Sequence, residues 1–165
     1  MDAGVAGRGH PEVHQRRVEI YLDSCSVRGV LETIHPRVSD HLASEGDTLT
    51  LLAARVVTRD GTQLARGTST LIHKPVILFV VDLSSAAGYS GFRVERMQRE
   101  VMLNVGSIWL RGRAHLPIGA DLANFVSGSM ARFMPITDAT VIGAQAVEPR
   151  TVLVNRDQLR CMIVE

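Results

Sequence analysis

An alternating stretch that occurs twice decides the fold of this chain. Residues 18–29 read VEIYLDSCSVRG, and residues 101–112 read VMLNVGSIWLRG. Both runs alternate apolar and polar side chains and end in Arg-Gly, at a constant offset of 83 residues (111 − 28). Alternation of this kind over about four to eight residues is typical of a half-buried β-strand. Each stretch therefore predicts a β-hairpin.

Other segments follow the same pairing. Residues 49–57 match 133–141 at an offset of 84 (141 − 57), and residues 71–74 match 153–156 at an offset of 82 (156 − 74). Loop insertions between fixed strands leave such a drift of one or two residues. We therefore expect an internal duplication, in which the two copies share buried surface because each is near the lower size limit for a core of its own.

The duplication divides the chain into four segments. Gly, Ala and polar residues without periodicity predict a disordered tail, and a run rich in Ser, Ala and Gly predicts a linker. The expected segments are a tail (1–15), a first β-barrel repeat (16–82), a linker (83–98) and a second β-barrel repeat (99–165).

The predicted elements are mainly strands. No stretch carries an apolar period of 3.6 residues over three turns, so helix should be minor. Asp60-Gly61 is a hairpin turn signal. Further strands are expected at 49–57, 63–71, 75–81, 133–142 and 158–164, and a short helical turn at 37–42.

Composition excludes several classes of protein. With 165 residues, 45% hydrophobic and 21% charged, the whole chain is not disordered. A net charge of +1 supplies no general attraction for nucleic acid or an anionic membrane. The longest apolar run, 76–81, is too short to span a bilayer. Cys25 and Cys161 have no metal-binding spacing and lie in strand-like contexts, which favours buried free thiols and a reducing, cytoplasmic location.

Three motifs resemble a known family. The segment 36–42 resembles the P-x-R-L-S-D-F-L-N segment of a small bacterial domain family of unknown function. In the second copy, 133–141 resembles that family's F-L-P-L-T-D-A-x-V strand, and 154–159 resembles its V-N-R-D-x-I ending. Each copy keeps the motifs that the other has lost. The resemblance implies a small β-rich domain and brings no activity with it.

The layout of the copies also resembles Sm-like barrels. Those barrels are strongly bent, five-stranded SH3-like folds, and many of them bind RNA. The resemblance implies that the turn before the last strand, Asn155-Arg156, and its counterpart His73-Lys74 could contact a ligand. Asn and Arg provide donors suited to RNA bases. The alternative is a purely structural turn, which the different chemistry of the two copies favours.

The remaining candidates have structural readings beside functional ones. Arg28 and Arg111 could form anion sites, or cover a bend made by the glycine that follows each. Asp40 and Asn124 are read as caps of short helical turns. His41 aligns with Phe125, so we expect it to be partly buried and hydrogen-bonded.

No pattern of nucleophile, paired carboxylates, metal ligands or phosphate loop is recognisable, so the sequence predicts neither an enzyme, a cofactor nor a metal site. We expect two tandem small barrels that bind other proteins or self-associate through exposed strand edges, with no membrane partner. RNA binding by an Sm-like protein is the alternative.

Overall fold

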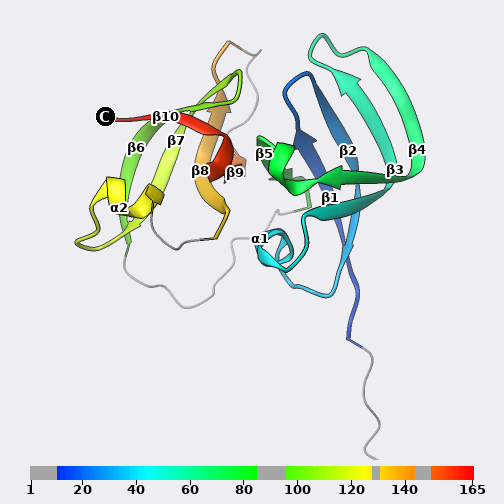
Figure 1. Cartoon of the computed structure of the whole chain (residues 1–165), viewed down its shortest axis with the longest axis horizontal. Coiled ribbons are helices and arrows are strands. Elements are labelled where there is room, and N and C mark those ends of the chain that lie inside the picture. Colours follow the sequence, from blue (N-terminus) through cyan, green and yellow to red (C-terminus); the bar gives the residue numbers. More distant parts are fainter. Residues whose placement is uncertain (1–10, 85–95, 128–130, 144–149) are drawn as a thin grey trace, which may run out of the picture.

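The computed structural model describes residues 11–84, 96–127, 131–143 and 150–165. These residues form a mainly β protein with one ten-stranded sheet in which every pairing is antiparallel. The strand order is β10-β6-β7-β8-β9-β5-β1-β2-β3-β4, and the sheet is not closed (Figure 1). The strands are β1 (His14–Tyr21), β2 (Cys25–Thr33), β3 (Thr48–Thr58), β4 (Gln63–His73), β5 (Phe79–Asp82), β6 (Arg96–Val105), β7 (Ile108–Pro117), β8 (Phe133–Val141), β9 (Arg150–Asn155) and β10 (Leu159–Val164). The helices are α1 (Val38–Ala43) and α2 (Leu122–Ser127), with 3₁₀ turns η1 (Lys74–Val76) and η2 (Arg156–Gln158).

The N-terminal half (β1–β5) and the C-terminal half (β6–β10) have the same order of elements. Each runs through two strands, a short helix, two strands, a 3₁₀ turn and a last strand. Their strands also lie in the same spatial order, β5-β1-β2-β3-β4 and β10-β6-β7-β8-β9. The halves are joined where β5 pairs with β9.

The hairpin registers agree with the offset expected from the sequence, but the third strand does not. Glu19 lies opposite Arg28, and Met102 lies opposite Arg111, an offset of 83. In the third strands, however, Val27 pairs with Val56 and Leu110 with Val141, an offset of 85 (141 − 56) rather than 84. A run of mostly apolar residues has few landmarks, so its pattern alone leaves a one-residue shift undetected.

The bend that both Arg-Gly pairs predict is present. Pairing of β2 with β3 shifts between Arg28 and Val30, and pairing of β7 with β8 shifts between Arg111 and Arg113. A Cβ on Gly29 would lie 3.0 Å from the Leu52 carbonyl oxygen, and one on Gly112 would lie 2.9 Å from that of Thr137. Both glycines therefore allow the partner strand to approach closely at a bulge.

Opposite these glycines the third strands are strained at one residue each. Ala53 has a φ of 48° and Asp138 a φ of 50°, and 138 − 53 again gives an offset of 85. Such values are uncommon for residues other than glycine. The same bulge geometry therefore occurs in both halves.

Three predicted boundaries were wrong. β1 begins at His14, so residues 14–15 belong to a strand rather than the tail, and β6 begins at Arg96, so 96–98 belong to a strand rather than the linker. These ends carry mostly polar side chains, but backbone pairing with Thr33 and Pro117 extends the strands. Residues 74–76 form a 3₁₀ turn, which shortens the strand expected at 75–81. Residues 1–10 of the predicted tail and 85–95 of the predicted linker lie outside the described residues.

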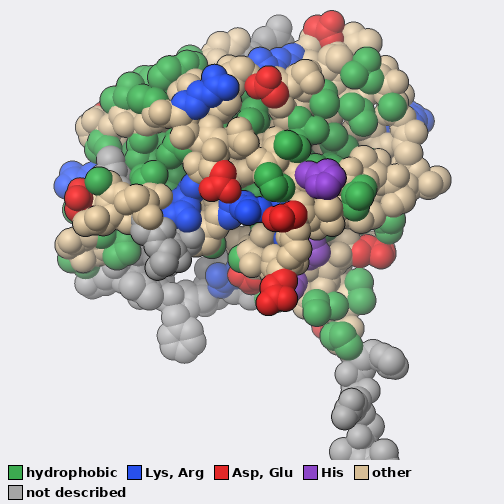
Figure 2. Space-filling view, viewed as in Figure 1, with side chains coloured by type: hydrophobic (Ala, Val, Ile, Leu, Met, Phe, Trp, Pro, Cys, Tyr) green, Lys and Arg blue, Asp and Glu red, His purple; other side chains and the backbone are tan. Residues whose placement is uncertain are grey.

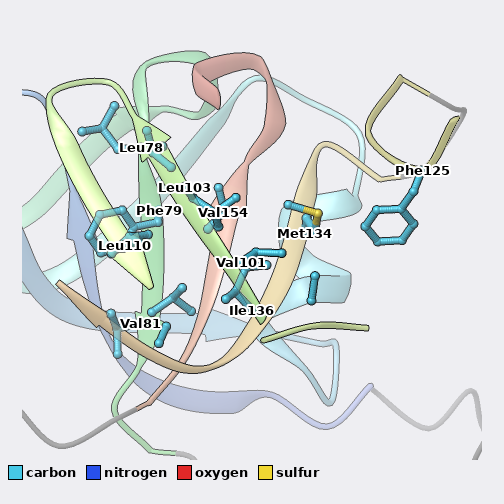
Figure 3. Close-up of a cluster of buried hydrophobic side chains, with 14 of the residues drawn as sticks. Leu78, Phe79, Val81, Val101, Leu103, Leu110, Phe125, Met134, Ile136 and Val154 are labelled. Carbon is cyan, nitrogen blue, oxygen red and sulfur yellow. The ribbon is translucent and has the colours of Figure 1, made fainter. Parts of the chain in front are cut away.

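The two halves share their cores, as their small size predicts. The core of the C-terminal half includes Leu78, Phe79 and Val81 from the N-terminal half (Figure 3). The core of the N-terminal half in turn includes Phe133 and Leu153 from the C-terminal half. Successive residues of a strand point to opposite faces, so β5 and β9 contribute to both cores. The joint between the halves is thus part of the hydrophobic core on both faces of the sheet.

Candidate interaction edges and the joint between the halves

The joint between the halves is a short antiparallel ladder of β5 with β9. Phe79 lies opposite Val154, Val80 opposite Leu153, and Val81 opposite Val152. All six side chains are buried, with exposed fractions between 0% and 7%. The joint combines backbone hydrogen bonds with apolar burial on both faces of the sheet.

Asn155 closes one end of this ladder. Its side chain is fully buried, and its amide nitrogen donates to the carbonyl oxygens of Ile77 at 2.8 Å and Lys74 at 3.3 Å. Its amide oxygen accepts from the Asp157 backbone N–H at 3.1 Å, and its own backbone N–H donates to the Leu78 carbonyl at 2.9 Å. The predicted ligand residue Asn155 thus uses its hydrogen-bonding groups to hold the halves together.

Charged side chains reinforce the joint at the surface. Arg132 of the C-terminal half lies 3.0 Å from Asp47 of the N-terminal half and 3.0 Å from Asp157. On the face shown in Figure 2, basic and acidic side chains gather in the middle of the molecule. Exposed pairs of this kind contribute at most about 1 kcal/mol each, so burial rather than charge carries the joint.

The two edges of the sheet are the counterparts of the two joined strands. β4 is the fourth strand of its half, as β9 is of the other, and β10 is a fifth strand like β5. Neither β4 nor β10 has a second neighbour among the described residues. Yet both present large apolar side chains to solvent: Leu71 is 62% exposed, Ile163 45% and Val164 41%. Their counterparts Leu153, Val81 and Asp82 lie in or beside the joint.

Of the other predicted turn residues, Lys74 is buried and His73 is exposed on β4. The Lys74 ammonium donates to the carbonyl oxygens of Ser44 at 3.0 Å and His41 at 3.4 Å, at the end of α1. Burial lowers the pKa of Lys74, and Arg132 lowers it further. The Arg156 guanidinium donates to the Val126 carbonyl at 3.1 Å.

The two recurrent arginines have different partners. Arg28 lies 3.0 Å from the buried carboxylate of Glu19, which raises the pKa of Arg28 through a hydrogen bond. Arg111 instead pairs with Glu165 at 2.5 Å and Glu100 at 3.6 Å. The equivalent positions therefore carry different chemistry in the two halves.

The loop predictions are partly right. His41 is half-buried, with Nδ1 3.0 Å from the Thr33 hydroxyl, as expected. Burial lowers its pKa, with further contributions from Lys74 and His35. The helix caps differ from the predicted ones, Asp40 and Asn124, however. The residue at the start of α1 makes no side-chain cap, and the turn of α2 is bonded by Asp121, which accepts from Ala123 N–H at 3.3 Å.

Both cysteines are free and lie on strands, but neither is fully buried as the sequence predicted. Cys25 is half-buried, whereas Cys161 is exposed on β10. An apolar strand pattern predicts burial only if a neighbour covers the strand, and β10 is an edge.

Sequence reasoning missed the buried polar group around Glu19. Ser26 donates to Glu19 at 2.9 Å, and Tyr21 stacks on Phe79 with ring centroids 4.3 Å apart. Burial of the Tyr21 side chain, together with the smaller effect of the nearby Glu19 charge, raises the pKa of Tyr21 to about 12. The recurring Arg at the end of each hairpin was the available signal, since register places Glu19 opposite Arg28.

Within the described residues, no cluster of three His, Cys, Asp or Glu side chains could hold a metal ion. None of the helices in that part of the chain is long and apolar enough to cross a membrane. No protein-family model, curated protein or solved structure matches this chain.

Proposed function

We propose that this chain is a non-enzymatic association module, in which β4 of one copy pairs with β10 of another. The observation that carries the proposal is the exposed apolar surface on these edges. At the internal joint, the equivalent strands bury every apolar side chain that they pair. Unpaired backbone groups beside exposed apolar residues readily add a strand from another chain.

We further propose that the two halves descend from one duplicated unit, a strongly bent five-stranded sheet like that of Sm-like barrels. The shared order of elements, the shared strand order and the matching bulges support this origin. Under this proposal, the internal joint is one instance of a contact that copies of the chain could repeat.

The internal register predicts the register between copies. The C-terminal half pairs Asn104 with Cys161 as the N-terminal half pairs Tyr21 with Phe79, so Cys161 is the counterpart of Phe79. Val80 lies opposite Leu153 at the internal joint, and their counterparts are Met162 and Leu71. We therefore expect Met162 of one copy to lie opposite Leu71 of the next. The contact joins two different edges, so a pair of copies still has one free β4 edge and one free β10 edge. Further copies can add at these edges, which gives a ring or a filament.

A pair of single-cysteine proteins tests this register. In a Cys25→Ser, Cys161→Ser background, one protein carries Leu71→Cys and the other Met162→Cys. Mixing them under mild oxidation should give a disulfide-linked pair, because opposed residues in antiparallel strands have Cα atoms about 4.5–5.5 Å apart.

The matched control replaces Leu71→Cys with Leu64→Cys. Leu64 lies on the same strand with the same 62% exposed fraction. It is seven residues away, roughly 24 Å along a strand. Equal cross-linking by both partners, or a chain that remains monomeric at high concentration, would reject the proposal. If either protein cross-links to itself as fast as to the other, two copies of the same edge pair, β4 with β4 or β10 with β10, instead of β4 with β10.

RNA binding remains the alternative proposal. It rests on the donors of Arg156 and His73 near the two 3₁₀ turns. It predicts nucleic acid co-purifying with the protein and an affinity that falls steeply with salt. An Arg156→Ala variant that binds RNA as tightly as the parent chain would remove this alternative.

A further inference from the structure

A cleft lies beside the joint, between the outer face of the β1–β2 hairpin and the C-terminal half. Its volume is about 910 Å³, and residues of both halves line it. That volume falls in the range of sites for small organic ligands, roughly 300–1,000 Å³. The cleft is therefore large enough to admit a molecule rather than a few waters.

The floor of the cleft is apolar. Val81 of β5 and Val152 of β9 contribute to it from opposite positions on neighbouring strands, and the charged Glu19 of β1 lies beside them, opposite Val81. The stacked pair Tyr21 and Phe79 continues the floor. At the far end, Trp109 and Ile142 line the cleft and are 38% and 47% exposed. A ligand with an apolar body would cover these side chains.

The charges around the cleft are mainly positive. It is lined by four arginines, Arg17, Arg28, Arg59 and Arg150, and by one acid, Glu19. The Arg28 guanidinium already neutralises Glu19, and the Ser26 hydroxyl donates a hydrogen bond to the same carboxylate. Arg59 donates to Ser107 and to the Asp23 carbonyl.

Arg17 and Arg150 stand together at one end of the floor. Leu83 N–H donates to the Arg17 carbonyl at 2.8 Å, and Arg150 lies two residues before Val152 on the strand beside β5. Strand spacing puts them roughly 10 Å apart on either side of Leu83. In the described part of the chain, no carboxylate pairs with either guanidinium.

We propose that this cleft binds an amphipathic organic anion, with its carboxylate or sulfonate between Arg17 and Arg150 and its apolar body along the floor. Guanidinium groups bind such heads through charge-assisted hydrogen bonds. The matching hairpin of the C-terminal half has Glu100 at the position of Arg17, and Met102 and Asn104 at the positions of Glu19 and Tyr21. The site is thus specific to the internal joint.

Fluorescence of 8-anilinonaphthalene-1-sulfonate, an aromatic sulfonate, tests the site in the full chain. We expect saturable binding, displaced by decanoate and far less well by decanol, which has the same apolar body without the charge. The double variant Arg17→Gln, Arg150→Gln should bind at least about tenfold more weakly, since a hydrogen bond to a charged group contributes roughly 1.5–3 kcal/mol. The control Arg66→Gln, Arg99→Gln removes the same charge from exposed positions outside the cleft and should bind normally.

The two cysteines supply a second, independent measurement. Cys25 lines the cleft and Cys161 does not. In a Cys161→Ser protein, saturating decanoate should slow the reaction of Cys25 with the neutral reagent N-ethylmaleimide several-fold. In a Cys25→Ser protein, it should leave the rate at Cys161 unchanged.

Absence of saturable dye binding, equal binding by the two double variants, or an unprotected Cys25 would each overturn the proposal. None of these outcomes depends on association through β4 and β10. The oligomeric state, measured on the same samples by light scattering, shows separately whether that proposal fails.

Discussion

Replacing Asn155 by alanine should loosen the joint between the halves. The buried amide donates to Ile77 at 2.8 Å and to Lys74 at 3.3 Å, and accepts from Asp157 at 3.1 Å. The variant would leave these backbone groups without that partner. Each net hydrogen bond contributes about 1 kcal/mol, and a buried group left unsatisfied costs about 1–3 kcal/mol. We expect the free energy of unfolding to fall by about 2–4 kcal/mol.

Urea denaturation of dilute protein measures this loss, and His73→Ala is the matched control. His73 is the counterpart of Asn155 at an offset of 82 (155 − 73), but it is exposed on the free edge. Its replacement should change the stability of the monomer by no more than about 0.5 kcal/mol. If Asn155→Ala were as mild as His73→Ala, the joint would not depend on this amide, and the reasoning would be refuted.

Three further predictions concern the bulge, pH and the free edge. Gly112→Ala places a Cβ 2.6 Å from Ile136 Cγ2, so its urea midpoint should fall further than that of Gly29→Ala, with a loss of about 1–3 kcal/mol; equal midpoints would contradict this. Because burial lowers the pKa of His41, the unfolded chain binds a proton more readily, so His41 contributes stability that is present above pH about 6.5 and lost as the pH falls. His41→Gln should therefore lose less stability between pH 7 and pH 5 than the parent chain, and an unchanged pH dependence would argue against a depressed pKa. Leu71→Lys should leave the urea midpoint of the monomer unchanged but abolish association in light scattering; persistent oligomers would exclude this edge.

The sequence could predict most of the fold because local patterns specify strands. Alternation in residues 18–29 and 101–112 identified both first hairpins, and Asp60-Gly61 marked a turn that forms with Gly61 at a φ of 88°. The Arg-Gly pairs predicted bends that are present as bulges. The strand boundaries were predicted less well, since the mostly polar ends of β1 and β6 become strand through backbone pairing, which no side-chain pattern records.

The candidate sites could be predicted much less well. The sequence singled out Asn155 for its chemistry, but its role at the joint depends on carbonyl groups about eighty residues earlier in the chain. Neither the cleft nor its pair Arg17 and Arg150 was visible, because these residues are 133 positions apart (150 − 17) and only the β5–β9 ladder brings them to one face.

The amino-acid sequence by itself determined the strands, the bends and the recurrence of one order of elements, because these depend on residues close together along the chain. Only the tertiary structure decided which edges are joined and which remain free. Leu153 and Leu71 occupy equivalent positions, yet one is 7% exposed and the other 62%. The physical reason is that burial of a strand depends on its neighbour in the sheet, and that neighbour comes from a distant part of the chain.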